Sequence, residues 1–278
     1  MGISVIIPTL GGENLDKTIS YLNNSIIIPD EIIICIPEKF YEKPVINSTK
    51  ENIKILKTNV MGQVAQRAEG FKVAKYEYIL QLDDDVLIDN NCISELYDII
   101  KNSNKLATSP KIYNQKGSYH SPRVKNKRET FYQKFIFWLI NGNRGFEAGK
   151  ISKNGIAMGL PDTKDDYEVE WLSGACLMHR KENLITHDFY PYQGKAYSED
   201  IIHSIIMRKK RIKLIRSGRA TCKVNLSSGI DTKSILKEFY SVLRIGLHIV
   251  ENKRNYLNYV IYHIVIYISK VSILFKNK

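Results

Sequence analysis

The segment Tyr78-Ile79-Leu80-Gln81-Leu82-Asp83-Asp84-Asp85 carries the clearest fold signal in this chain of 278 residues. A short, mostly apolar run predicts a buried β-strand, and three consecutive carboxylates end it. In open α/β sheets, ligands bind beyond the carboxyl ends of the strands. The acidic cluster is therefore both the end of a predicted strand and the first candidate for a binding site.

Strand and helix signals alternate along the first hundred residues. Apolar, β-branched runs predict strands at Ser4–Pro8, Glu31–Ile36, Ile53–Leu56 and Tyr78–Leu82. Helical periodicity predicts helices at Asn14–Leu22, Val64–Ala74 and Ile93–Ile100. This order predicts an α/β fold with a mostly parallel sheet that has helices on both faces.

The second half of the chain has weaker signals. We expect a polar loop at Lys111–Arg128, an aromatic helix at Phe131–Ile140 and a glycine-rich, mobile stretch at Asn141–Lys164. Regular structure is expected again at Val169–Met178, in a helix at Glu199–Lys209, and in strands near Ile212–Ile215 and Ala220–Val224. A last helical region is expected from Thr232, where apolar residues share one helix face.

The net charge of +12 is the unusual feature of the composition, since 44% hydrophobic and 25% charged residues are ordinary values. A strong positive charge implies an anionic partner such as nucleic acid, a membrane surface or a phosphorylated substrate. Basic residues cluster at Arg123–Arg128 and Arg208–Arg219, without a nucleic-acid reading motif. We therefore expect no nucleic acid and favour an anionic membrane surface. The alternative is an ordinary solvated surface.

The four cysteines, Cys35, Cys92, Cys176 and Cys222, lie far apart and have no C-x-x-C spacing. This pattern argues against a disulfide framework or a zinc site and fits a reducing compartment. The amino-terminal apolar run ends at Pro8 and follows no basic segment, so it does not resemble a signal peptide. We expect a cytoplasmic protein.

The carboxylates of Asp83, Asp84 and Asp85 repel one another unless a positive charge lies among them. In an extended D-x-D segment the first and third side chains point the same way, so Asp83 and Asp85 can share a ligand. Mg²⁺ supplies such a charge and is typically held by one or two carboxylates plus phosphate oxygens. The alternative is a solvated turn or a helix cap, and the cluster alone does not separate a sugar-transfer site from a phosphatase site.

Five motif-like segments follow one another in a defined order. They are Ser4–Thr9, Gly62–Gly70, Tyr78–Asp85, Glu170–Met178 and Tyr197–Ile202. In this order they resemble family 2 of the inverting nucleotide-sugar glycosyltransferases, and the resemblance covers roughly Ser4 to Lys213. It implies the GT-A fold, a Rossmann-like mixed sheet flanked by helices, and a transferase that uses Mg²⁺ or Mn²⁺.

The resemblance implies a nucleotide-diphosphate sugar as the donor and assigns residues to it. Pro8 and Thr9 would line the nucleobase pocket after the first strand. Arg67 would approach the base or the diphosphate, because its planar, charged fork suits either. Asp83 would contact the ribose or the metal, and Asp85 would hold the metal that bridges the two phosphates.

The resemblance also assigns the acceptor side. Asp200 would be the general base and Glu199 its neighbour, while Trp171 and Gly174 would shape the pocket for the acceptor glycan or lipid-linked glycan. Inverting transfer needs a carboxylate within hydrogen-bond reach of the attacking hydroxyl. It also needs a cation at the leaving diphosphate. The alternatives are that Trp171 is a core residue, and that Glu199 and Asp200 only favour the positive end of a helix dipole.

The chain departs from the family pattern in three places. The second strand ends in Ile36-Pro37-Glu38, where many members have acidic residues for the nucleoside. Glu38 is therefore the substitute there, and Gln66 and Asp84 complete the expected nucleotide-sugar site. No histidine occurs in Cys222–Asn225, which weakens the case for strict metal dependence. The Q-x-x-R-W signature is absent, which favours the addition of one sugar per encounter.

We expect residues 1–230 to form a GT-A catalytic domain, with a nucleotide-binding half (1–110) and an acceptor-binding half (111–230). Residues 231–278 would form a helical, partly apolar, membrane-associating extension. Polar residues interrupt the tail Leu257–Phe275, so it is marginal as a membrane span and better fits a helix lying in the interface. The alternative is a terminal helix packed on the domain. These features predict a peripheral protein at the inner face of the plasma membrane, acting in cell-surface polysaccharide synthesis.

Three rival functions remain open at this stage. An aspartyl-nucleophile phosphatase also has a D-x-D motif, but its nucleophile belongs on the first strand, which here ends in Pro8-Thr9. A nucleotidyltransferase needs basic residues in the loop after that strand, and Gly11-Gly12-Glu13-Asn14 has none. A basic membrane-surface adaptor would leave the acidic motifs without a role.

Overall fold

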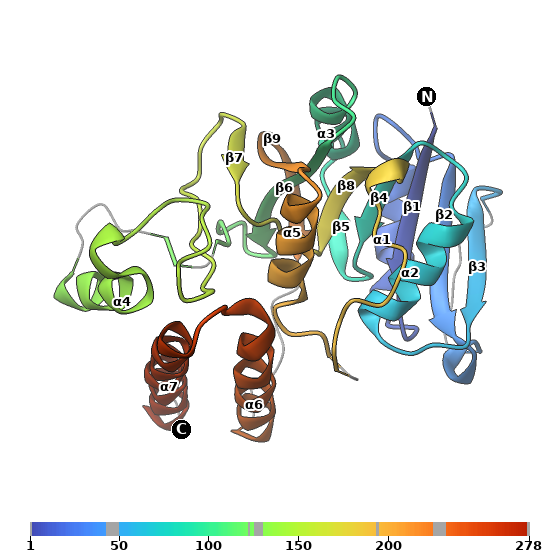
Figure 1. The fold of residues 1–278 in the computed structure, drawn as a ribbon. Coiled ribbons are helices and arrows are strands. Elements are labelled where there is room, and N and C mark those ends of the chain that lie inside the picture. The colour runs from blue at the N-terminus through green and yellow to red at the C-terminus, as the bar shows by residue number, and fades with distance from the viewer. Residues whose placement is uncertain are drawn as a thin grey trace. The chain divides into compact units, whose positions relative to one another are not determined.

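In the computed structural model, residues 2–42, 50–121, 123–124, 130–192, 195–224 and 232–276 are described. Their strands are β1 Ile3–Pro8, β2 Glu31–Pro37, β3 Ile53–Thr58, β4 Tyr78–Leu82, β5 Val86–Ile88, β6 Leu106–Asn114, β7 Tyr167–Val169, β8 Cys176–Arg180 and β9 Lys213–Val224. Their α-helices are α1 Leu15–Asn23, α2 Gln63–Val73, α3 Cys92–Ile100, α4 Phe131–Asn141, α5 Glu199–Lys209, α6 Thr232–Ile249 and α7 Lys253–Lys276 (Figure 1). Short 3-10 helices are η1 Glu38–Phe40, η2 Gly142–Arg144 and η3 Lys181–Asn183.

The described strands form one mixed sheet in the order β3-β2-β1-β4-β8-β6-β9-β5, with β7 added to β9. The first four strands in this order are parallel, and β8 runs antiparallel to both β4 and β6. Ile6 of β1 lies opposite Gln81 of β4. This register brings the carboxyl end of β1 and the acidic cluster after β4 to the same edge of the sheet.

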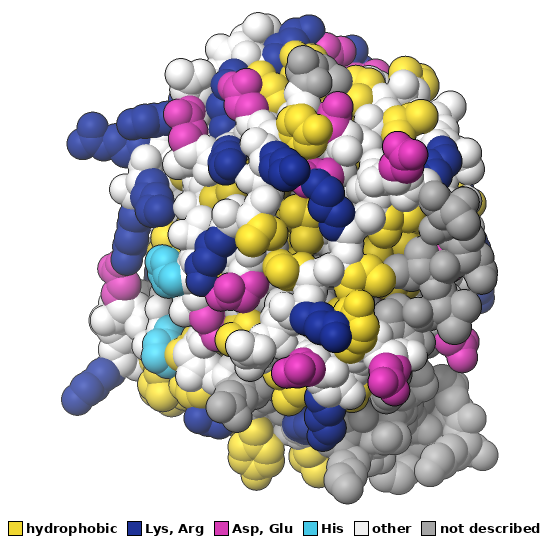
Figure 2. Space-filling model, turned by 90° about the vertical axis from the view of Figure 1, so that its right-hand side faces the viewer, with side chains coloured by type: hydrophobic (Ala, Val, Ile, Leu, Met, Phe, Trp, Pro, Cys, Tyr) yellow, Lys and Arg dark blue, Asp and Glu magenta, His cyan; other side chains and the backbone are white. Residues whose placement is uncertain are grey.

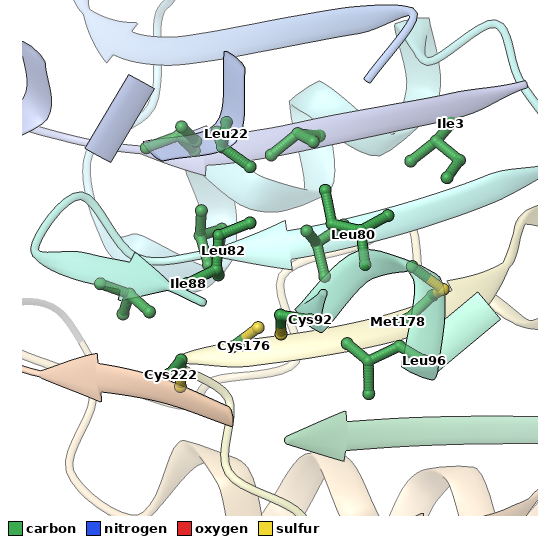
Figure 3. Close-up of a cluster of buried hydrophobic side chains, with 14 of the residues drawn as sticks. Ile3, Leu22, Leu80, Leu82, Ile88, Cys92, Leu96, Cys176, Met178 and Cys222 are labelled. Atoms are coloured by element: carbon green, nitrogen blue, oxygen red, sulfur yellow. The ribbon is translucent and has the colours of Figure 1, made fainter. Parts of the chain in front are cut away.

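Alternating side chains of the central strands pack against helices on both faces. Val5 and Leu80 belong to a large buried cluster that also contains residues of α1 and α3 (Figure 3). Ile6 and Ile79 face the other side and pack with Phe71 of α2. Full burial of each such side chain contributes roughly 1.5–3 kcal/mol, which explains why these short runs form strands.

The cysteines are small core residues. All four are buried and free. Cys92, Cys176 and Cys222 lie together in the large cluster, although they come from α3, β8 and β9 (Figure 3). Burial raises the pKa of the Cys35 thiol to about 12. The Cys35 thiol therefore remains protonated and acts as a packing group.

The structure differs from the sequence-based expectation in the second half of the sheet. The predicted loop at Lys111–Arg128 was wrong at its start, because β6 continues to Asn114. The two strands expected near Ile212–Ile215 and Ala220–Val224 are one strand, β9. The ordered segment expected at Val169–Met178 contains the end of β7, a loop and the start of β8.

The chain divides into two compact units. The first comprises Met1–His120 and Asp162–Leu226, and the second comprises Ser121–Pro161 and Ser227–Lys278. The second unit therefore includes α4 in addition to the carboxyl-terminal helices, whereas the sequence suggested contiguous parts with a boundary near residue 230. None of the helices in the described ranges combines the length and apolar character that a membrane crossing requires.

Within the second unit, α7 packs against both α4 and α6. Gly246 of α6 allows a close approach, since a Cβ atom there would lie 2.4 Å from Cε1 of Tyr259 on α7. The Tyr259 hydroxyl donates a hydrogen bond of 2.9 Å to the Val242 carbonyl. Gly246, which interrupts the helical pattern in the sequence, therefore lies at the contact between α6 and α7.

Candidate active site

The buried side chain of Arg67 is the centre of the polar cluster at the edge of the sheet. Arg67 lies on α2, and its side chain is 3% exposed. Its Nη2 donates to Oδ1 of Asp83 at 3.1 Å, and its Nη1 donates to Oε1 of Glu199 at 3.1 Å. One guanidinium therefore joins the carboxylate that follows β4 to the carboxylate that begins α5.

Asp83 is held by several groups. Its Oδ1 also accepts a hydrogen bond of 2.6 Å from Nε2 of Gln63, and its backbone N–H donates to the Ala175 carbonyl at 2.9 Å. Burial raises the pKa of Asp83 to about 6, with Glu199 and Asp85 adding to the rise and Arg67 and Gln63 opposing it. The side chain remains 23% exposed, so it can still meet a ligand.

Burial and the neighbouring Asp84 carboxylate raise the pKa of Asp85, while the ammonium group of Lys195 opposes the rise. Asp85 is half-buried, and Lys195 is exposed in the loop before α5. Gln63 lies in the Gly62–Gly70 segment but had no role assigned there, and Lys195 lies outside the five motif-like segments. Their closeness to the D-x-D carboxylates arises only from the fold.

Asp84 makes hydrogen bonds that hold the acidic turn in place. Its carboxylate accepts a hydrogen bond from the Thr9 hydroxyl, and its carbonyl accepts one of 2.9 Å from Oγ1 of Thr18. Nε2 of Gln66 donates to the carbonyls of Thr9 and Cys35 at 2.9 and 2.8 Å. These contacts tie the ends of β1 and β2 to α2 and to the acidic turn.

Several residues expected to contact the nucleotide are buried. Thr9 is 4%, Gln66 2% and Arg67 2% exposed, and Pro8 is also buried. Glu38, in contrast, is exposed at the start of η1, directly after β2. The buried side chains are therefore placed to hold the loops of the site in position. The sequence alone did not distinguish this role from direct contact with a ligand.

The loop before β8 is fitted to Glu199. A Cβ atom on Gly174 would lie 2.2 Å from Oε1 of Glu199, so a larger residue would collide with the buried carboxylate. The Gly174 carbonyl accepts a hydrogen bond of 2.6 Å from Nε2 of Gln81. Within the described ranges, Oε2 of Glu199 and Nε of Arg67 have no hydrogen-bond partner. Such buried, unsatisfied polar atoms are rare and need a specific explanation.

The start of α5 has an unusual backbone. Ser198 immediately precedes the helix and has φ 56° and ψ 24°, in the left-handed region. This conformation costs of order 1 kcal/mol or more for a residue with a side chain, and it is concentrated at functional sites. It sets the direction in which Glu199 and the half-buried Asp200 enter the first turn.

Trp171 lies half-buried in the loop between β7 and β8. The next residue, Leu172, donates its backbone N–H to Oγ of Ser204 on α5 at 3.1 Å. The loop that contains Trp171 and Gly174 is therefore attached to the helix that begins with Glu199 and Asp200. The residues expected on the acceptor side come from neighbouring elements.

A pocket of about 130 Å³ opens beside this cluster, between the start of α2 and the loop before α5. Its lining includes Gly62, Gln63, Tyr190, Tyr192 and Ala196. Gln63 also donates to Asp83, so the pocket adjoins the acidic turn. Tyr190 is 8% exposed and Tyr192 is half-buried, and no short motif in the sequence marks either as part of the site.

The residues present fit a divalent cation that is shared with a phosphorylated ligand. In the part of the chain that the structure describes, no set of three or more His, Cys, Asp or Glu side chains is arranged to bind a metal by itself. Mg²⁺, however, is commonly held by one or two carboxylates plus substrate phosphates. The raised pKa of Asp85 indicates a carboxylate that a cation would stabilise.

Comparison with known proteins was made by sequence and by structure. The family profile described as Glycosyl transferase family 2 matches residues 4–152. No curated protein matched the sequence at a significant level. The match covers more than half of the chain and includes both Arg67 and the D-x-D segment.

Of two similar solved structures, the first shows the same fold. The crystal structure of GalNAc-T7 with UDP, GalNAc and Mn²⁺ is similar with a TM-score of 0.59 and 14% identity, over 82% of this chain and 44% of that one. The present chain thus spans less than half the length of GalNAc-T7. The structure of residues 1–349 of S. aureus TarS aligns with a TM-score of 0.49 and 15% identity, over 95% of this chain and 71% of that one.

Proposed function

The chain belongs to glycosyl transferase family 2, and from this premise we propose that it moves one sugar from a nucleotide-diphosphate sugar to a hydroxyl of a glycan or lipid-linked glycan, with inversion. It is a glycosyltransferase with the GT-A fold. The observation that carries the finer proposal is the double ion pair of Arg67 with Asp83 and Glu199. This contact joins the proposed donor and acceptor sides.

Asp200 is the proposed general base. Its carboxylate takes the proton of the acceptor hydroxyl while the hydroxyl oxygen forms a bond to the anomeric carbon. The bond from that carbon to the diphosphate oxygen breaks in the same step, and the nucleoside diphosphate leaves. Glu199 is fixed by Arg67 and begins the same helical turn, so it supports the orientation that Asp200 needs.

The acidic turn is proposed to receive the donor. Asp85 would hold Mg²⁺ or Mn²⁺ together with phosphate oxygens, and Asp83 would contact the ribose or the metal. When bound, the cation stabilises the negative charge that develops on the leaving diphosphate. Lys195 already acts on Asp85 electrostatically, and its charge suits an approach to the same phosphates.

The buried polar residues are proposed as positioning residues. Thr9 and Gln66 connect the ends of β1 and β2, and Arg67 orients Asp83. Exposed Glu38 is the candidate for contact with the nucleoside beyond β2. This division refines the sequence-based set, in which all of these residues were expected to line the nucleotide pocket.

Trp171 is proposed as a platform for a sugar ring, and Gly174 as a residue that shapes the acceptor pocket by leaving room for the Glu199 carboxylate. GalNAc-T7, with the same fold, was crystallised with UDP, GalNAc and Mn²⁺, which are ligands of the types proposed here. A lipid-linked acceptor would place the protein at an anionic membrane surface, on its cytoplasmic side. Addition of a single sugar per encounter completes the proposal.

The test is release of nucleoside diphosphate from a panel of nucleotide sugars, with and without Mn²⁺ and with candidate glycan acceptors. We expect one donor to be turned over, with an acceptor-dependent rate that Mn²⁺ increases. Formation of free phosphate from phosphomonoesters, without turnover of any nucleotide sugar, would contradict the proposal.

Asp85→Ala provides a specific test of the metal site. We expect weaker donor binding in the presence of Mn²⁺ and little change in its absence, measured by isothermal titration with the nucleoside diphosphate. Asp98→Ala, at an exposed carboxylate on α3, is the matched control and should behave like the unchanged protein. An unaltered Mn²⁺ response of Asp85→Ala would remove Asp85 from the site.

A further inference from the structure

The positive charge of the protein is concentrated in the second unit. Ser121–Pro161 and Ser227–Lys278 contain 16 basic and 5 acidic residues, a net charge of +11. The first unit is about twice as long and contains 25 basic and 24 acidic residues, a net charge of +1. On the face seen from the β3 side, basic and acidic side chains are interspersed (Figure 2).

The basic cluster in the first unit, which the sequence suggested as a membrane-attracting patch, is partly neutralised by acidic neighbours. Arg208 pairs with Glu170 at 3.3 Å and Arg219 pairs with Glu95 at 3.0 Å. Lys213 lies 3.8 Å from Glu168. With a net charge of only +1 for the whole first unit, the second unit is the stronger candidate for attraction to an anionic surface.

The second unit also exposes apolar side chains in stripes. On α4, Phe131, Phe135 and Trp138 are 87%, 41% and 57% exposed. Their spacing of four and three residues places them on one side of the helix. Exposed cations are Lys134 within α4 and Arg144 in the following η2.

Helix α7 has a stripe of its own. Leu257, Ile261, Ile264 and Ile268 recur at spacings of four, three and four residues and are 58%, 37%, 41% and 62% exposed. Helix α6 adds Leu236, Tyr240 and Leu247, at 52%, 66% and 61%. Exposed basic residues on these helices are Lys237, Arg244, Lys253 and Arg254.

Polar residues of α7 make contacts within the second unit. Tyr262 is 2% exposed and accepts a hydrogen bond of 2.7 Å from Nε of Arg123. Asn255 donates to the Lys153 carbonyl at 3.0 Å. Polar groups of α7 thus make contacts within the unit, while aliphatic groups are left outside.

We propose that the second unit docks on an anionic lipid bilayer through the apolar stripes of α4, α6 and α7, with its basic residues at the headgroups. Interfacial helices combine such an apolar stripe with Lys and Arg and bury it at the boundary between headgroups and acyl chains. Trp, Tyr and Phe suit this depth because their rings tolerate both sides of the boundary. The net positive charge of the second unit favours binding to a negatively charged surface.

This proposal gives the membrane surface named under the proposed function a specific location and rests on that function only for the identity of the acceptor. It uses no residue of the catalytic cluster. Each basic residue near the surface should strengthen binding by about fivefold at low salt. Loss of two inserted apolar side chains should weaken binding at least about tenfold.

The experiment is sedimentation of the full chain with vesicles, without any sugar donor. One set of vesicles contains equal parts of phosphatidylglycerol and phosphatidylcholine, and the other contains phosphatidylcholine alone. The test variants are Phe131→Ser/Trp138→Ser on α4 and Leu257→Ser/Ile268→Ser on α7. The matched control is Ile26→Ser/Ile28→Ser, at apolar residues of the first unit that are 66% and 51% exposed.

We expect binding to the anionic vesicles that falls as salt is raised, a loss of at least about tenfold in both test variants, and no loss in the control. Unchanged binding in both test variants would overturn the proposal, as would equal binding to neutral vesicles. If the substitutions instead dissolve a dimer and leave vesicle binding intact, the stripes bind a second copy. Circular dichroism checks that each variant is folded.

Asp200→Asn separates this proposal from the proposed function. It should sediment with anionic vesicles like the unchanged protein even if it has lost transfer. Transfer to a soluble acceptor by a chain that does not bind vesicles would overturn the docking proposal alone. If the chain binds vesicles but turns over no donor, the docking proposal is supported and the proposed transferase function is contradicted.

Discussion

The two units use similar apolar content in opposite ways. In the first, isoleucines such as Ile6, Ile33 and Ile79 are at most 2% exposed and lie inside a sheet covered on both faces. In the second, a subset that includes Phe131, Trp138 and Ile268 is 57–87% exposed on the helices, and this unit also carries most of the net charge. The first unit therefore provides a buried framework around the candidate active site, whereas the second unit presents exposed apolar side chains that can contact a partner.

The polar contacts of the units differ in the same way. Those of the first unit converge on one place, where Arg67, Asp83 and Glu199 meet at the edge of the sheet. Those of the second fix helices to one another, as in the bonds from Tyr256 and Tyr259 of α7 to carbonyls of α6. Substitutions in the first unit should therefore affect catalysis, and substitutions in the second should affect packing or docking.

The largest effect is expected for Asp200→Asn. Removing the proposed base should lower kcat by roughly 10²–10⁴-fold, because proton transfer in the transition state is lost. Donor binding should stay nearly intact, since the amide keeps the size of the carboxylate. Steady-state kinetics and donor titration check both points. Lost donor binding with unchanged kcat would mean that Asp200 belongs to the donor side.

Arg67→Met should give the largest loss of stability. The change leaves the buried Glu199 and the partly exposed Asp83 without their shared cation, and breaking a buried ion pair in this way costs about 3–5 kcal/mol. The control is Arg219→Met, in which an exposed arginine loses its pair with Glu95 and less than about 1 kcal/mol is expected. Urea unfolding of both variants measures the difference. Equal effects would show that the Arg67 contacts add no special stability.

The sequence predicted the strands and helices that have strong local patterns. β4 is found at Tyr78–Leu82 and α5 at Glu199–Lys209, with the predicted bounds. β6 was missed because Thr108, Ser109, Pro110 and Lys111 lack the apolar pattern of a buried strand. It is stabilised by pairing with β8 and β9, and a register shift between Ser109 and Lys111 accommodates the proline. Such pairing is tertiary and leaves no local signal.

The same limit applies to the candidate site. The D-x-D and Glu-Asp motifs could be found because each is a short segment with a known arrangement. That Arg67 is buried between them, and that Gln63 and Lys195 act on Asp83 and Asp85, depends on how distant segments pack. The grouping of α4 with α6 and α7 was likewise invisible, because it joins segments that are far apart in the chain.

Gly246→Ala tests the independence of the second unit. Alanine normally stabilises a helix relative to glycine, but this Cβ would lie 2.4 and 2.8 Å from atoms of the Tyr259 ring. We expect a net loss of about 1–3 kcal/mol from overpacking between α6 and α7. Faster hydrogen exchange in these helices would reveal it, with donor binding unchanged. Ser241→Ala on α6 is the control. A parallel loss of donor binding would show that the units are coupled.

A pH dependence of stability should arise in the first unit. His179 and His203 have ring centroids 5.4 Å apart and are flanked by Phe71 and Phe189. Burial lowers the pKa of His179 from 6.5 to about 3, and it lowers the pKa of His203 as well. Both imidazoles therefore stay neutral in the folded chain at mildly acidic pH.

In the unfolded chain the same histidines take up protons below about pH 6.5. The unfolded state then binds more protons than the folded state, so stability falls as the pH is lowered from 6.5 toward 3. His179→Leu removes one of the two groups and should flatten this decline, and His179→Leu/His203→Leu should flatten it further. Urea unfolding at pH 7 and pH 5 measures the slope. If stability falls between pH 7 and pH 5 as steeply in the double variant as in the unchanged protein, the acid sensitivity arises from other groups. The two histidines would then contribute only to packing.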